Sequence, residues 1–108
     1  MFIRLFAEAI NKEEALKHSK NFESFISDSV IELKNTKIER YWKIPELYCI
    51  EFAFQGIIPE RMIEAVKKLG NNPFVIADDG KIEEYIFSKT TGEIYLEKIE
   101  WVLIHIGE

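Results

Sequence analysis

Residues 41–56, YWKIPELYCIEFAFQG, constrain the fold of this chain more than any other stretch. Alternate positions in this stretch hold four large side chains: Tyr48, Ile50, Phe52 and Phe54. Because successive side chains of a β-strand point to opposite faces, these four share one face of a strand over residues 48–54. The opposite face, which includes Cys49 and Glu51, is of mixed polarity. The pattern predicts a central antiparallel strand with one face covered and the other partly open.

Hydrophobic periodicity along the rest of the chain predicts two helices and five further strands. The strands are expected over residues 1–9, 30–38, 74–77, 82–88 and 93–106, and the helices over residues 12–27 and 59–69. Asn11 is a suitable N-cap for the first helix, and Pro59 suits the start of the second. Gly70 is expected as the C′ residue that ends the second helix.

The predicted element order is β-α-β-β-α-β-β-β. Its first six elements match the ferredoxin-like βαββαβ arrangement, in which two helices cover one face of an antiparallel sheet. The last two strands then form a C-terminal β-hairpin extension. We therefore expect a single α+β domain over residues 1–108. The other sheet face stays free and carries many aromatic residues, which is typical of a surface that binds a partner, often a second copy.

The charge balance bears on the class of partner. Fourteen Lys and Arg face nineteen Asp and Glu, for a net charge of −5. An acidic surface repels phosphate backbones, so direct nucleic-acid binding is disfavoured, whereas a basic protein would be attracted. The same charge also serves solubility alone.

Several features indicate a cytoplasmic protein. Charges interrupt every apolar run, so we expect no transmembrane segment and no membrane partner. The N-terminus has one Arg and no small-residue cleavage site, which argues against a signal peptide. The single cysteine, Cys49, excludes an intramolecular disulfide, and its place in an apolar strand predicts a buried, reduced thiol.

No catalytic, metal-binding or cofactor motif is evident in the sequence. His18 and His105 lie outside any metal-ligand spacing, and Cys49 has no base near it in sequence. We therefore expect neither an enzyme nor a cofactor. A hydrolase with paired carboxylates stays open, because that pairing is spatial and not sequential.

Two groups of residues are candidates for partner binding. One is an acidic hairpin, with four carboxylates around a turn: Asp78, Asp79, Glu83 and Glu84. The other flanks Pro45 and consists of Tyr41, Trp42, Glu46 and Tyr48. Carboxylates at an interface steer association, and Tyr and Trp are frequent interface hot spots. The alternatives are a merely solvated hairpin and aromatic residues that pack in the core.

An acidic α+β domain without evident catalytic residues resembles the immunity proteins of bacterial polymorphic-toxin and contact-dependent inhibition systems. Residues 41–48, YWKIPELY, are similar to the aromatic-Lys-x-Pro turn of some small families of this kind. The resemblance implies a non-enzymatic cytosolic inhibitor that binds a cognate toxin, often a basic nuclease, and blocks its active site or substrate path. It assigns no role to residues outside this turn.

A second interpretation, from a different class, is a dimeric ferredoxin-like domain that binds or converts a small molecule in a cleft beneath its sheet. The neighbouring gene would separate the two interpretations. A large upstream gene with a variable C-terminal toxin domain favours the inhibitor, and a metabolic operon favours the small-molecule protein.

Overall fold

The computed structural model describes residues 1–106 of the 108-residue chain. Its elements are β1 (Phe2–Glu8), α1 (Lys12–Ile26), the short 3₁₀ helix η1 (Ser27–Ser29), β2 (Val30–Arg40), β3 (Leu47–Ile57), α2 (Pro59–Leu69), β4 (Phe74–Asp78), β5 (Lys81–Ser88) and β6 (Ile99–His105). The fold is therefore α+β. Neither α-helix in this part of the chain is long and apolar enough to cross a membrane.

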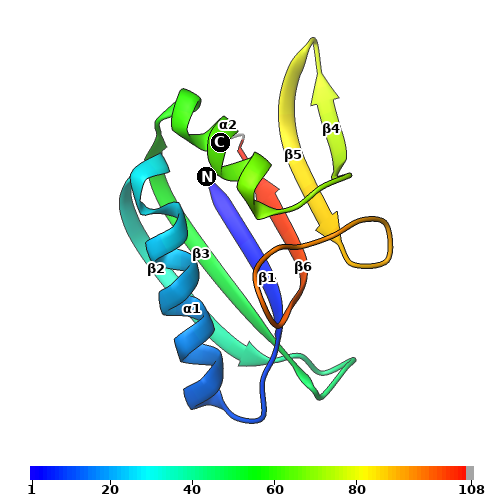
Figure 1. The fold of residues 1–108 in the computed structure, drawn as a ribbon. Coiled ribbons are helices and arrows are strands. Elements are labelled where there is room, and N and C mark those ends of the chain that lie inside the picture. The colour runs from blue at the N-terminus through cyan, green and yellow to red at the C-terminus, as the bar shows by residue number, and fades with distance from the viewer. Residues whose placement is uncertain (107–108) are drawn as a thin grey trace.

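The strands form one antiparallel sheet in the order β2-β3-β1-β6-β5-β4. Strand β1 lies inside the sheet between β3 and β6, as its two partly apolar faces predict. Both helices lie on the same face of the sheet (Figure 1). The prediction that the helices share one face is therefore confirmed.

The core lies between this sheet face and the two helices. The alternate residues of β3 predicted to share one face are all buried there. Phe52 stacks between Phe22 of α1 and Phe54, with ring centroids 5.4 and 5.7 Å apart. Beside it, Ile3 and Leu5 of β1 are fully buried. The pattern of large residues in β3 thus decides which face of the sheet the helices cover.

Local signals in the sequence predict where each helix begins. The Asn11 side-chain oxygen accepts a hydrogen bond from the Glu14 backbone N–H at 2.9 Å, so the predicted N-cap is confirmed. Pro59 occupies the first turn of α2, where its missing N–H has no helical partner to lose. Strand β2 contains a register shift between Leu33 and Asn35, where it pairs with β3.

The strand order corrects the predicted topology. We expected the strand at residues 74–77 to complete a ferredoxin-like sheet and the last two strands to extend it as a C-terminal hairpin. Instead β6 lies beside β1, and the β4–β5 hairpin forms the far edge. The place beside β1 requires apolar side chains that the helices can cover. Val102 and Ile104 of β6 meet this requirement and are fully buried, whereas every residue of β4 is exposed.

The last strand is shorter than predicted, because residues 93–98 form a loop and β6 begins at Ile99. Lys98 has a φ of 67°, a left-handed conformation that interrupts an extended strand. The loop is instead attached to the end of α2, where the Tyr95 N–H donates to the Leu69 carbonyl at 2.8 Å. Gly70 directly follows the last residue of α2, as expected, but its backbone is extended, with φ 175°, and pairs with Ile94 as an isolated bridge.

Candidate functional site

The sheet face opposite the helices displays aromatic residues from several elements. Strand alternation and the observed register place Phe2 and Phe6 of β1 on this face, next to Trp101 of β6. No helix found in residues 1–106 covers it (Figure 1). We call this surface the open face.

Four aromatic rings run across the open face in mutual contact. The Trp101 and Phe6 rings meet edge to face at 5.8 Å, the Phe6 and Tyr41 centroids are 4.9 Å apart, and the Tyr41 and Trp42 centroids are 6.3 Å apart. We call these four residues the aromatic row. It begins on β6, crosses β1 and ends just after β2. Trp42 is 80% exposed, and the other three side chains are partly exposed.

Charged side chains border the aromatic row, and some of them form ion pairs, whereas Lys43 lies over the Trp42 ring, 5.2 Å from its centroid. Arg4 lies 3.6 Å from Glu51, and Lys89 lies 3.4 Å from Glu100. A hollow of about 250 Å³ borders the row and is lined by Tyr41 and Trp42, with Arg4, Glu51 and Cys49 among its other walls. The surface therefore combines an aromatic centre with charged neighbours and a recess large enough for a partner's side chain.

Cys49 lies on the open face and not in the core, which corrects the predicted burial. Its thiol is half-buried, 3.8 Å from a carboxylate oxygen of Glu51. Burial, followed by the charge of Glu51, raises the thiol pKa from 9.0 to about 11. At neutral pH the thiolate is therefore scarce, and Cys49 is a poor nucleophile.

The four residues predicted around Pro45 do not all lie on the same surface. Tyr41 and Trp42 belong to the aromatic row, and Glu46 is exposed in the turn. Tyr48 is only 5% exposed and points to the helix side, so it is not available to a partner. Its hydroxyl accepts a hydrogen bond from Arg40 at 2.9 Å. Tyr48 therefore stabilises the β2–β3 turn from the helix side of the sheet.

The acidic hairpin forms as predicted, but it lies far from the aromatic row. Asp79 and Gly80 both have positive φ, the conformation that a tight two-residue hairpin requires. Asp78 and Asp79 are exposed at the tip, and Glu83 lies next to it. Glu84 is instead held 2.9 Å from the His105 ring. The hairpin and the β2–β3 turn lie at opposite edges of the sheet and at opposite ends of the molecule (Figure 1).

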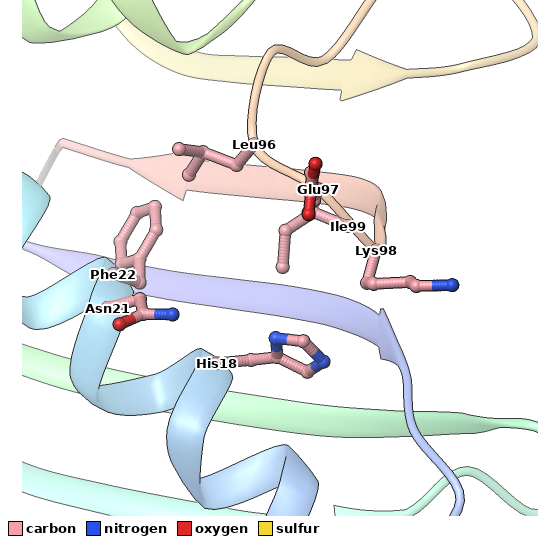
Figure 2. Close-up of a pocket in the computed structure, with 7 residues that line it drawn as sticks. All are labelled: His18, Asn21, Phe22, Leu96, Glu97, Lys98 and Ile99. Carbon is pink, nitrogen blue, oxygen red and sulfur yellow. The ribbon is translucent and has the colours of Figure 1, made fainter.

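A small cavity between α1 and the β5–β6 loop has a histidine in its wall (Figure 2). His18 and Asn21 line it from α1, and Glu97 and Lys98 from the loop. Its volume is about 140 Å³, below the roughly 300–1,000 Å³ typical of small-molecule sites. His18 Nε2 lies 3.1 Å from the Glu8 carbonyl oxygen, which accepts its hydrogen. This hydrogen bond links α1 to the end of β1.

Over the described part of the chain, no three His, Cys, Asp or Glu side chains converge on a possible metal position. The surface that does assemble is the aromatic row, and sequence reasoning identified half of it. Phe6 and Trp101 were missed as site residues, although each lies at an alternate position of an apolar strand. Their partnership depends on β6 lying beside β1, which no local pattern reveals. No protein-family model, curated protein or solved structure matches this chain.

Proposed function

We propose that this chain is a non-enzymatic inhibitor that binds a cognate protein toxin in the cytoplasm and occludes its active site, as an immunity protein does. The aromatic row is the observation that supports this proposal. Tyr and Trp side chains supply large contact areas at low entropic cost and are enriched among interface hot spots. An uncovered sheet face that displays three of them in a contiguous row with Phe6 is suited to binding a protein surface.

The partner is proposed to be a basic protein, such as a nuclease domain. The chain has a net charge of −5, and the acidic hairpin has only Lys81 to offset its carboxylates. Beside the aromatic row, Arg4 and Glu51 form an ion pair, so these two side chains add no net charge to the apolar centre. This arrangement of an apolar centre and a charged periphery is that of a typical protein interface.

The proposal includes a finer description of the fold. In strand order, β2-β3-β1-β6 corresponds to the four strands of a ferredoxin-like sheet, with β6 in the position of the last strand. The β4–β5 hairpin is then an insertion between the second helix and that last strand, and it widens the open face beyond four strands.

The second interpretation, a small-molecule protein, has weaker support. Its best site is an apolar groove of about 300 Å³ between α2 and β5, lined by Ile63, Ile82 and neighbouring residues. Of the lining residues that the structure describes, only Tyr85 has a polar group on its side chain. A small-molecule site needs a few convergent polar groups to orient its ligand.

Co-expression with the toxin encoded by the adjacent gene tests the proposal. The native chain should protect the cell and bind the toxin directly. Trp42→Ala and Trp101→Ala should each increase the dissociation rate by about tenfold or more, because truncated hot spots cost more than about 1.4 kcal/mol.

Tyr95→Ala is the matched control, since Tyr95 is an exposed aromatic residue on the β5–β6 loop, outside the aromatic row. This variant should bind as the native chain does, and thermal melts should show all three variants folded. Unchanged dissociation rates for both tryptophan variants would exclude the aromatic row as the binding surface. A toxin that neither binds the chain nor is neutralised by it would refute the proposed function.

A further inference from the structure

Strand β4 is an unprotected edge of the sheet. It pairs with β5 on one side and is the last strand in the sheet order. All five residues of β4 are exposed, and Phe74, with 65% of its surface accessible, is followed by exposed Val75 and Ile76. The free side of this strand presents backbone N–H and C=O groups together with apolar side chains, which is a template for a further strand.

The opposite edge of the same sheet shows the protection that β4 lacks. Strand β2 carries charged side chains along its length: Glu32, Lys34, Lys37 and Glu39. It also contains the register shift between Leu33 and Asn35. Charges and bulges are the usual means by which proteins prevent edge-to-edge pairing. Residues 74–77 of β4 have no charge, and the register shift in this hairpin comes only after Ile76.

The sequence of β4 is complementary to itself in one antiparallel register. If a two-fold axis passes through Val75, each Phe74 lies opposite Ile76 of the second copy, and Val75 lies opposite its own counterpart. Every central cross-strand pair is then apolar, and such pairs stabilise a sheet. Asp78 falls opposite Asn72 of the second copy, so no like charges meet. An axis through Ile76 would instead place Phe74 opposite Asp78.

We propose that two copies of this chain associate through β4 in the Val75-centred register and form one continuous antiparallel sheet. The exposed Ile63 and Ile82 lie on the helix side near this edge and add apolar area beside the paired strands. A strand pair of this length is small compared with a standard interface of about 1,600 Å². The dimer therefore has a low affinity, and its population rises with protein concentration. The proposal does not depend on the identity of any toxin.

The dimer would also join the two open faces into one surface. Because the aromatic row ends after β2, at the edge opposite β4, the two rows lie at the outer ends of the joined sheet. Each copy thus keeps its aromatic row free for a partner, and the dimer presents two such sites.

Sedimentation analysis of the full chain over a range of concentrations tests this proposal. The mass should rise from 12.7 kDa, that of one chain, to twice that value as the concentration increases. Val75→Lys and Val75→Glu should each stay monomeric, because each places two like charges opposite one another on the axis. An equimolar mixture of the two variants should recover the dimer mass. Ile31→Lys is the matched control, because exposed Ile31 lies on β2, the opposite edge strand of the sheet. This variant should dimerise normally.

A double variant, Phe74→Glu with Ile76→Lys, keeps the proposal testable if a single charge disturbs the hairpin. The proposed register places the two introduced charges opposite each other across the axis, so this variant should dimerise. A native chain that is monomeric up to millimolar concentration would refute the dimer. Persistence of the dimer in Val75→Lys, or failure of the mixture to recover it, would refute the register. If the native chain is monomeric and Val75→Lys no longer binds the toxin, then β4 pairs with a strand of the toxin. That outcome would refute pairing between two copies of this chain.

Discussion

Cys49 illustrates how one residue's surroundings control its chemistry. With the thiol pKa at about 11, and not 9.0, the folded protein holds about 100-fold less thiolate at pH 8 than an unperturbed thiol would. Alkylation of the native chain should therefore be slower than that of the urea-unfolded chain by a similar factor. The difference should shrink as the pH rises toward 11, because the folded thiol then ionises too. Equal rates at pH 8 would contradict the raised pKa.

Phe52 is a core residue whose fully buried ring stacks on both Phe22 and Phe54. Phe52→Ala should lower the free energy of unfolding by roughly 3–5 kcal/mol. Urea denaturation at a low protein concentration measures this loss. The matched control is Phe74→Ala, since exposed Phe74 leaves no internal cavity when it is truncated, and a change of only about 0.5 kcal/mol is expected. A similar loss for both variants would contradict the assigned core.

Among the elements, the attachment of the β5–β6 loop to α2 depends on Gly70. The backbone of Gly70 pairs with Ile94, and a Cβ atom there would collide with the Glu93 carbonyl. Gly70→Ala should therefore cost about 1–3 kcal/mol of unfolding free energy, as overpacking does elsewhere. Gly80→Asn is the control, because Gly80 has a φ of 76° and open space around it, and Asn tolerates this conformation. Thermal and urea melts compare the two, and an unaffected Gly70→Ala would disprove the close approach.

For the whole molecule, the acidic hairpin is expected to affect how fast a basic partner arrives more than how long it stays. Reversal of both Asp79 and Glu83 to Lys should slow association with the cognate toxin at low salt. The difference in association rate between this variant and the native chain should disappear near 1 M salt, where charges are screened beyond about 3 Å. Reversal of Glu23, which is partly exposed on α1, and of Glu64, which is exposed on α2, changes the net charge equally and controls for location. If the two double variants slow association equally, the hairpin acts only through the net charge of the chain.

Much of the local structure follows from patterns of neighbouring residues. The Asn11 cap, the Pro59 start and the buried face of β3 were all predictable, because each depends on contacts or alternation within a few residues. Tyr41 and Trp42, which make up half of the aromatic row, were predictable from residue type beside a proline turn. The burial of Tyr48 was not, since it depends on packing against Ala9 and Ala15, which come from a distant part of the chain.

By itself, the sequence determined the helices, the strand faces and the acidic hairpin, because hydrophobic periodicity and turn chemistry act over a few residues. Only the tertiary structure decided that β6 lies beside β1 and that β4 is left as an edge. That choice is a competition between distant strands for the covered centre of the sheet, and the strand that buries more apolar surface takes it. The same choice brought Trp101 against Phe6 and completed the aromatic row, so the proposed binding surface is a consequence of strand order.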